Sequence, residues 1–358
     1  MLAAAGGVVL AATASAATKA YEIVTLAEGV HGFVWKDALQ DPIEGNALFI
    51  VNDRDVVVVD SGLLPSSART MIAELRKITP KPVRYVVNTH WHDDHINGNA
   101  VYRELFPGVE FIAHTHTRTD AIEQSMVPRP DNIANMEKTA EKYERWVATG
   151  KDDDGKPLAE ERKVRAAEIV GLMRSGIPEL RAVVDVPPDL TFEDHLVLRR
   201  GDRTVEIRWL GLGNTRGDVV VFLPKERIVA TGDLLVWPIP FMFGSYYDRW
   251  IETLGRLDAL AADTLFLSHG APQGSRDYLR EVQGLLAAIV ERAKAAAATD
   301  LPVEEAKKRV DLKDWREKFA GADPKRQRAF DAFVVAPAVE RAIRQARKEP
   351  AAFTQKLR

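Results

Sequence analysis

The sequence predicts a layered α/β fold. Three short runs rich in β-branched residues, 47–52, 55–60 and 83–88, have the character of buried strands. Between the second and the third lies segment 66–78, in which apolar residues recur at helical spacing. A strand, helix, strand order is typical of a sheet that carries helices on its face. The 358 residues can bury a substantial core, and a hydrophobic share of 46% with 28% charged residues is ordinary globular usage.

The remaining elements follow in chain order. Strand 83–88 leads into a histidine-rich turn, and segment 110–116 is expected to form a further strand. Charged sequence of helical character then fills about 120–189, which we interpret as a helical insertion. Strands are expected to return at 195–200, 204–210, 219–223, 227–233 and 263–270, with a helix at 248–260 and only helices from about residue 275 onward.

The chain divides into three expected parts: a leader at 1–17, a main domain at 18–290 and a helical C-terminal extension at 291–358. The leader carries no charge and ends, at 14–16, in the small-x-small pattern of a signal-peptidase site. We therefore expect a periplasmic or secreted protein, with a cytoplasmic one as the alternative. The basic segment that usually opens a signal peptide is missing, so either the natural start lies upstream or this is an alanine-rich frayed end.

Charge and cysteine content narrow the classes of function. Lysine and arginine number 49 against 52 acidic residues, a formal net charge of -3, which provides no basic field for nucleic acid or anionic lipid. Beyond the leader no run approaches the roughly 20 apolar residues of a membrane span, so no membrane partner is expected for the mature form. Cysteine is absent, so a bound metal must be held by nitrogen and oxygen atoms. The expected partner is a small-molecule substrate, and the oligomeric state is left open.

The histidine-rich turn, VNTHWHDDHINGNA at 87–100, carries the strongest functional signal. His90 and His92 alternate at the end of a strand, so both side chains can leave the same side of the backbone. Asp94 and His95 follow where the chain turns into a helix and project in a second direction. Imidazole and carboxylate groups arranged in this way suit a divalent transition metal, above all zinc.

A simpler interpretation is that these histidines lie on the surface or cap the following helix, with Asp93 as the N-cap. The chain has only eight histidines, and three of them fall within these six residues, 90–95. Chance clustering is a poor explanation for that density, so the metal interpretation is favoured.

The chain resembles the metallo-β-lactamase superfamily, whose His-x-His-x-Asp-His signature stands here at 90–95. Three more motifs appear in the family's order: VVVVDSG around Asp60, ATGDLLV around Asp233 and LSHG around His269. The resemblance covers about residues 22–290. It implies a four-layer αβ/βα sandwich, with a helical insertion and a helical C-terminal extension in this chain, and with two metal ions between the sheets at one edge.

The resemblance also implies which residues bind the metals, expected to be one or two zinc ions per chain. The implied ligands are His90 and His92 for the first metal, Asp94, His95 and His269 for the second, and Asp233 as the bridge between them.

Two further positions depend on this resemblance. Asp60 would orient the histidine turn from behind, as metal-bound histidines usually require; a turn residue before Gly62 is an equally simple interpretation. The family places a third histidine for the first metal where this chain has Asn214. An amide oxygen is a weaker zinc ligand than imidazole, so the first metal is expected to bind more weakly. Alternatively, Asn214 only shapes its loop and a water completes that metal.

An aromatic loop at 237–247 follows Asp233 directly. Trp237, Phe241 and Tyr246 are candidates for the wall of a substrate pocket, and a plug of the hydrophobic core is the alternative.

His114 and His116 form a second His-x-His pair. No matching carboxylate accompanies them in the family pattern, so we favour a strand end near the cleft over a metal site.

The function implied is a zinc-dependent hydrolase. A bound metal lowers the pKa of water towards about 7 and polarises a carbonyl, so hydroxide would attack an activated carbonyl of a β-lactam, lactone or thioester-like substrate. Asp94 or Asp233 would orient that hydroxide and take its proton, and they are the candidate catalytic residues. The alternatives are a non-catalytic metal-binding protein with a degenerate first metal site, or a phosphodiesterase of the same fold. A di-iron oxidoreductase of related fold would favour a glutamate at the position of Asp94.

Overall fold

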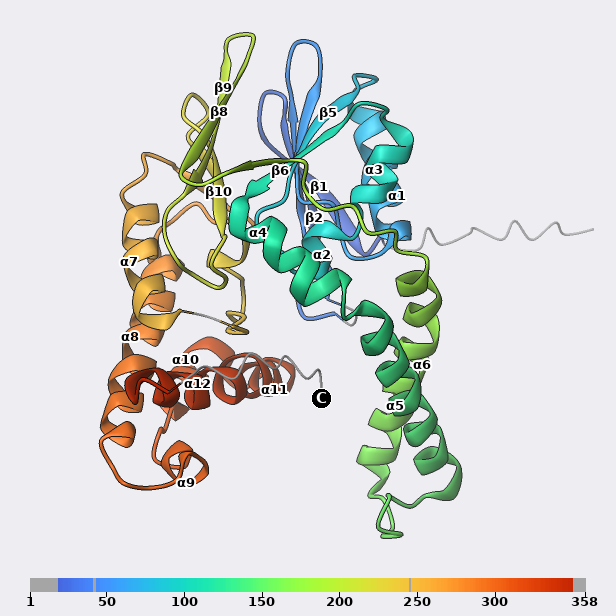
Figure 1. The fold of residues 1–358 in the computed structure, drawn as a ribbon, viewed down its shortest axis with the longest axis vertical. Coiled ribbons are helices and arrows are strands. Elements are labelled where there is room, and N and C mark those ends of the chain that lie inside the picture. Colours follow the sequence, from blue (N-terminus) through green and yellow to red (C-terminus); the bar gives the residue numbers. More distant parts are fainter. Residues whose placement is uncertain (1–18, 41–42, 245, 350–358) are drawn as a thin grey trace, which may run out of the picture.

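The computed structural model describes residues 19–40, 43–244 and 246–349, so the leader expected at 1–17 lies outside the described residues. Two β-sheets pack face to face and helices cover both outer faces (Figure 1). The four-layer αβ/βα sandwich that the sequence predicts is confirmed.

The first sheet has seven strands in the described chain, in the order β1 to β7. Neighbours from β1 to β4 are antiparallel, and neighbours from β4 to β7 are parallel. Carboxyl ends of parallel strands meet at one edge, which is where polar residues can gather. The strands are β1 (Tyr21–Ala27), β2 (Val30–Trp35), β3 (Ala47–Val51), β4 (Val56–Val59), β5 (Val83–Val87), β6 (Glu110–His114) and β7 (Leu190–Phe192).

The second sheet has five strands among the described residues, in the order β12, β11, β10, β9, β8. All its neighbours are antiparallel except β11 and β12, which run parallel. Its strands are β8 (His195–Arg200), β9 (Arg203–Trp209), β10 (Val219–Leu223), β11 (Ile228–Ala230) and β12 (Thr264–Phe266).

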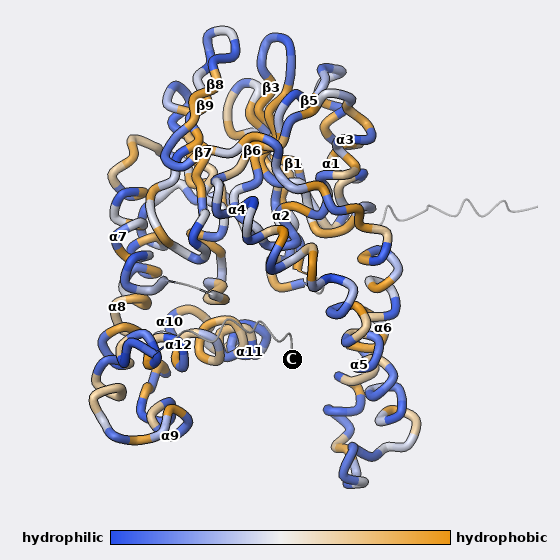
Figure 2. Tube along the Cα trace, in the orientation of Figure 1, coloured by the Kyte–Doolittle hydropathy of each residue, from blue (hydrophilic) through white to orange (hydrophobic). Residues whose placement is uncertain are grey.

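Apolar side chains hold the layers together. Between the sheets lies a cluster of mostly branched side chains, represented by Leu48, Val57, Ile207 and Val221. Such residues fit two facing pleated surfaces, and the strands form the orange centre of Figure 2. A second cluster joins the first sheet to its outer helices, and a third joins the second sheet to α7, α8 and the C-terminal helices.

The helices are distributed by layer. Those on the first sheet and its loops are α1 (Pro65–Ile78), α2 (Asp93–Ile96), α3 (Asn99–Leu105), α4 (Thr115–Asp120) and the π-helix η1 (Ala121–Met126). The insertion forms the antiparallel pair α5 (Arg129–Thr149) and α6 (Glu160–Arg181), which projects away from the sheets (Figure 1). The second half contains η2 (Gly232–Leu234), α7 (Tyr247–Asp258), α8 (Asp277–Ala297), α9 (Val303–Lys307), α10 (Lys313–Ala320), α11 (Pro324–Phe330), η3 (Asp331–Val335) and α12 (Ala336–Ala346).

The C-terminal helices are not separate from the sandwich. Helix α8 runs through residue 290, and α12 packs along it. Buried residues of α12, such as Ile343, belong to the same cluster as Leu254 of α7 and Leu286 of α8. The extension therefore continues the outer helical layer of the second sheet. Within the described residues, no helix is long and apolar enough to cross a membrane.

Three expected strands are shorter than predicted. Strand β6 ends at His114 rather than 116, because the His114 side chain accepts a hydrogen bond from the His116 backbone and caps α4. Strand β11 ends at Ala230, because Gly232 adopts a φ of 54° and turns the chain into η2. Strand β12 covers only 264–266 of the expected 263–270. Because each of these strands ends early, a polar residue that was expected within the strand lies instead in a loop at the edge of the sheet.

Candidate metal centre

The turn after β5 presents the histidine motif at the edge of the first sheet. The backbone carbonyl of His95 accepts hydrogen bonds from the Asn88 side chain, at 2.8 Å, and from the Ser61 backbone, at 3.0 Å. The turn is thereby fixed to the ends of two parallel strands, β4 and β5. Gly45 allows a third loop to approach, since a Cβ there would lie 2.7 Å from the Asp94 carbonyl oxygen.

Asp60 lies directly behind the histidine turn. Its Oδ1 accepts a hydrogen bond from the Thr89 backbone at 2.8 Å, and its Oδ2 lies 2.9 Å from both Thr89 Oγ1 and His95 Nδ1. A carboxylate in this place can accept the Nδ1 proton of His95, which directs Nε2 into the site as a candidate metal ligand. The residue adopts a φ of 62°, a conformation that aspartate tolerates better than most residues.

Thr89 extends the same support to His90. Its hydroxyl donates to Asp60, and His90 Nδ1 lies 3.1 Å from the same hydroxyl oxygen. His90 Nδ1 can therefore donate to that oxygen, which leaves His90 Nε2 free as well. One buried carboxylate thus orients two imidazoles, one directly and one through a hydroxyl.

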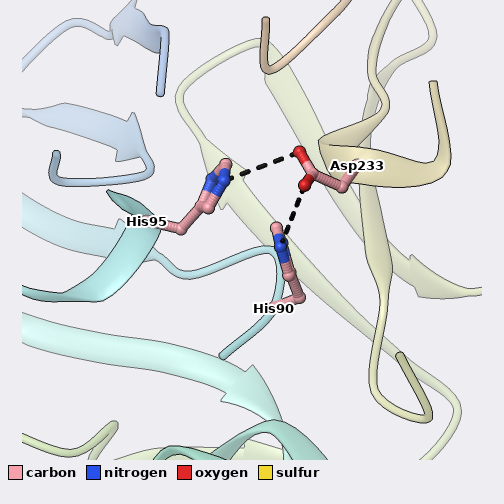
Figure 3. A group of neighbouring side chains, drawn as sticks. All are labelled: His90, His95 and Asp233. Atoms are coloured by element: carbon pink, nitrogen blue, oxygen red, sulfur yellow. Dashed lines mark ion pairs between the residues drawn. The ribbon is translucent and has the colours of Figure 1, made fainter. Parts of the chain in front are cut away.

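Asp233, on η2, lies between the two sets of histidines. Figure 3 shows its carboxylate facing His90 with one oxygen and His95 with the other. Oδ2 is 3.4 Å from His90 Nε2 and 3.7 Å from His92 Nδ1, whereas Oδ1 is 3.5 Å from His95 Nε2 and 3.4 Å from His269 Nε2. Ser268 donates a hydrogen bond to Oδ1. The arrangement is that of a carboxylate shared by two positions.

The second position is formed by Asp94, His95 and His269. Asp94 Oδ2 lies 3.3 Å from His95 Nε2 and 3.2 Å from His269 Nε2. His269 follows β12 on the second sheet, so this position joins the two sheets. These three residues form a group that could hold a metal ion.

The residues that the resemblance implies for the first position, His90, His92 and Asn214, lie near Oδ2 of Asp233. His90 Nε2 and His92 Nδ1 are 2.9 Å apart. Asn214 is fully buried, and its Nδ2 lies 3.5 Å from Asp233 Oδ2. His90, His95 and Asp233 form a second group that could hold a metal ion. The structure therefore brings together all seven residues that the sequence selected as ligands.

The charges of the centre are strongly coupled. Burial would lower the pKa of His269, but the Asp233 and Asp94 carboxylates raise it to about 9. Burial would also lower the pKa of His95, but the Asp94, Asp60 and Asp233 carboxylates raise that pKa well above its usual value. His90 differs, because burial and the neighbouring His95 lower its pKa to about 4. Burial would raise the pKa of Asp233, yet the surrounding histidines hold it well below the usual range.

These donors fit a divalent metal. The Nε2 atoms of His95 and His269 are buried and have no hydrogen-bond partner among the described residues. Buried polar atoms are nearly always satisfied, so imidazole nitrogens aimed at shared carboxylates point to an ion. A tetrahedral ion with bonds of about 2.0–2.1 Å separates its ligand atoms by roughly 3.3 Å. The contacts of 3.2–3.5 Å at the second position match that spacing.

The three aromatic candidates occupy different places. Tyr246 lines a cavity beside Asn214. Phe241 is buried, with its ring 5.0 Å from that of His269. Trp237 is half-buried, packs against the core and lies beneath the Arg326 guanidinium at 5.3 Å. Only Tyr246 among these three lines that cavity.

The second histidine pair has a structural role. His114 Nε2 lies 2.9 Å from the Glu193 carbonyl oxygen, and its Nδ1 accepts from the His116 backbone at 3.0 Å. The His114 ring also stacks on Trp209 at 5.3 Å. Both ring nitrogens are thus occupied within the protein, which supports the interpretation as a strand end.

Several supporting residues were missed from the sequence. Thr89 and Ser268 each precede a ligand histidine, and this adjacency was the available signal. Arg216 and Asp120, which form an ion pair beside the centre, are 96 residues apart. Phe333, in the C-terminal extension, contacts the aromatic loop. No local pattern marks these last three.

Known proteins resemble this chain in sequence and in fold. A linear primary-alkylsulfatase of a Pseudomonas species is 25% identical over 241 residues, which are 63% of this chain and 42% of the sulfatase. The chain thus spans less than half the length of that relative. A metallo-beta-lactamase from Pontibacter korlensis superposes with a TM-score of 0.53 at 18% identity, over 75% of this chain and 99% of that one. The DIM-1 metallo-beta-lactamase superposes with a TM-score of 0.51 at 16% identity, over 75% of this chain and 98% of that one.

These structural likenesses show a shared fold. The family model of the metallo-beta-lactamase superfamily matches residues 41–269, which include every ligand candidate described above. The chain belongs to the metallo-beta-lactamase superfamily.

Proposed function

We propose that this protein is a zinc-dependent hydrolase of an activated carbonyl compound, such as a β-lactam, a lactone or a thioester. One observation carries the proposal: the Asp233 carboxylate lies between two groups of histidines, and the buried Nε2 atoms of His95 and His269 have no hydrogen-bond partner among the described residues. Metal ions bound there would activate a water molecule and polarise the scissile carbonyl.

The two carboxylates of the centre have different tasks. The side chain of Asp233 is 2% exposed, and it also accepts a hydrogen bond from Ser268, so it is suited to hold the two positions at a fixed spacing. Asp94 is 16% exposed and can be reached by water. Burial would raise its pKa, but His95 and His269 hold the pKa below the usual range, so Asp94 stays ionised. We assign to the Asp94 carboxylate the acceptance of a proton from the attacking water and its transfer to solvent.

The deciding experiment combines a metal count with a substrate panel. Protein purified without added metal is measured for metals per chain and then assayed with lactams, lactones, thioesters and phosphodiesters. We expect zinc to be present, hydrolysis of at least one carbonyl substrate, loss of activity on chelation and recovery with zinc. Metal without any hydrolysis would favour the non-catalytic metal-binding alternative, and activity confined to phosphodiesters would favour the phosphodiesterase.

Sulfate esters are a second candidate class. The likeness to the linear primary-alkylsulfatase motivates this, since it extends over 63% of the chain. A linear alkyl sulfate therefore belongs in the panel, with release of inorganic sulfate as the readout. Release that exceeds every carbonyl reaction would replace the first proposal.

We also propose that the protein is exported, from the uncharged leader and its small-x-small site at 14–16. N-terminal sequencing of protein made by the native host tests this. A chain that begins near residue 17 supports export, whereas an intact Met1 in cytoplasmic protein contradicts it.

A further inference from the structure

A cavity of about 260 Å³ opens beside the first position. Asn214 lines it, and Asn214 Nδ2 lies 3.5 Å from Asp233 Oδ2. Trp91 also lines it, and its ring lies 4.6 Å from that of His92. The cavity therefore borders the residues that would bind the reacting group, and a substituent attached to that group can reach it.

Most of the cavity wall is apolar. Trp91, from the histidine-rich turn, and Phe243 and Tyr246, from the aromatic loop, line it with aromatic residues. Phe243 rests on Phe333 of η3, at a ring distance of 5.6 Å, and the Phe333 carbonyl accepts a hydrogen bond of 2.9 Å from the Met242 backbone. The C-terminal extension thus supports one wall of the cavity.

The charged residues of the cavity neutralise each other. Arg216 Nε lies 3.0 and 2.9 Å from the two Asp120 oxygens, and its Nη2 lies 2.6 Å from Oδ1. A guanidinium engaged in this bidentate way is a poor partner for a second carboxylate. The other polar wall residues, among them Gln124, Asn214 and Thr215, are uncharged. An ionised substituent that enters the cavity would therefore lose its hydration, and neither Arg216 nor Asp120 would compensate, because their charges are already paired with each other.

The size of the cavity sets an upper limit on its occupant. An apolar cavity of roughly 150 Å³ in a protein can hold a benzene molecule. The larger volume found here has room for a phenyl ring with a short alkyl link, or for a medium-length alkyl chain.

We infer that this cavity binds an uncharged apolar substituent of the substrate, of phenylalkyl or medium alkyl type, while the scissile bond lies at the metal centre. This rests on the proposed hydrolytic function and narrows its substrate class. In this proposal the start of the helical insertion contributes Gln124 to the cavity wall. The C-terminal extension supports that wall through Phe333.

The test is a series of thioesters with a common leaving group and variable acyl groups: acetyl, butanoyl, hexanoyl, phenylacetyl and the anionic succinyl. With zinc-loaded wild-type protein, kcat/KM is expected to rise by up to about fourfold per added methylene through hexanoyl. Succinyl is expected to react at least tenfold more slowly than butanoyl, because its carboxylate has no unpaired partner. A flat series, or a preference for succinyl, would overturn the inference.

Two variants sharpen the test. Phe243→Ala removes one aromatic wall and should reduce the hexanoyl-to-acetyl ratio by roughly tenfold. Asp120→Asn frees the Arg216 guanidinium and should raise the succinyl-to-butanoyl ratio at least tenfold. The matched control is Trp146→Ala on α5, which removes an aromatic ring remote from the cavity and should change neither ratio. Unchanged ratios in both cavity variants would contradict the assignment.

Direct binding separates this inference from the proposed function. If no thioester is hydrolysed, the proposed carbonyl chemistry fails, but the cavity can still be tested by calorimetry with neutral phenylacetamide and anionic succinamate. We expect phenylacetamide to bind and Phe243→Ala to weaken it about tenfold. Equal binding of both compounds, or binding unaffected by Phe243→Ala, would show that the cavity does not select apolar groups.

Discussion

The two metal positions share one carboxylate but differ in construction. The second position has three ionisable candidate ligands, Asp94, His95 and His269, which follow strands of both sheets. The first has His90 and His92 from a single turn, and its third residue is the amide Asn214. Both positions draw on more than one element, but two of the three residues of the first position share the turn after β5, so the geometry of that position depends more strongly on this one turn.

The positions also differ in how their histidines are supported. His95 rests directly on Asp60, and His90 is reached from Asp60 only through Thr89. Each position also has one histidine whose outer nitrogen is buried without a hydrogen-bond partner among the described residues, His92 Nε2 in the first and His269 Nδ1 in the second, so the difference lies in the direct contact of Asp60 with His95. Outer hydrogen bonds fix ring orientation and raise ligand basicity, so the second position should bind metal more tightly. The following predictions test that ranking.

The largest effect is expected from His95→Ala and His269→Ala. Each substitution removes a nitrogen from the second position, so each should abolish hydrolysis and lower the metal bound per chain. Metal content by elemental analysis and turnover of the best panel substrate are the measurements. His116→Ala is the control, because that ring is exposed and outside the centre. Full metal content and activity in either variant would show that the second position is wrongly assigned.

A pH effect on the metal-free protein should separate the two positions. His269 has a folded pKa raised to about 9, so the stability it contributes is fully present below about pH 6.5 and is lost as the pH rises towards 9. His90 has a pKa lowered to about 4, so it lowers stability as the pH falls from about 6.5 towards 4. Each change should reach a few kcal/mol at most.

Thermal or urea unfolding of chelator-treated protein between pH 4 and 10 measures both changes. His269→Gln should reduce the loss of stability at alkaline pH, and His90→Gln should reduce the loss of stability at acid pH. If both variants flatten the same side, the contrast between the two positions is not electrostatic.

A smaller effect is expected from Asp60→Asn. The amide keeps the hydrogen bond from the Thr89 backbone and tolerates the left-handed backbone, but it binds His95 without a negative charge. Zinc affinity at the second position should fall about 10- to 100-fold, as for other outer partners of metal-bound histidines. Competition with a chelator measures this. An equal loss at both positions would mean that the path through Thr89 matters as much as the direct contact.

Local patterns predicted a layered α/β fold, and the resemblance of the motifs to the family implied the sandwich and the candidate ligands. Strands such as β4 and β5 are continuous β-branched runs, and the ligands stand at strand ends in recognisable motifs. The Arg216–Asp120 ion pair could not be predicted, because its partners, at the end of α4 and in the loop before β10, are 96 residues apart and meet only in the folded chain. The contact of Phe333 with Phe241 depends likewise on how α12 packs on α8. Such long-range contacts cannot be predicted from the local periodicity of the sequence.

The position at which this chain departs from its family gives the most selective prediction. Asn214→His replaces an amide by an imidazole, which is a better zinc ligand. Asn214 is fully buried but lines the cavity of about 260 Å³, so the larger ring has space on that side. We expect the zinc stoichiometry to approach two per chain, with roughly tenfold tighter binding confined to the weaker of two titrating sites.

Asn214→Gln is the matched control, since it adds size but keeps the amide, and it should not tighten that site. Competitive zinc titration of the wild type and both variants decides between the possibilities. Activity can change in either direction, because a loosely held first metal can suit the native substrate. If wild-type protein already binds two zinc ions with equal affinity, Asn214 does not weaken the first position. The two positions would then differ in construction but not in strength, because the shared Asp233 carboxylate would compensate for the missing imidazole.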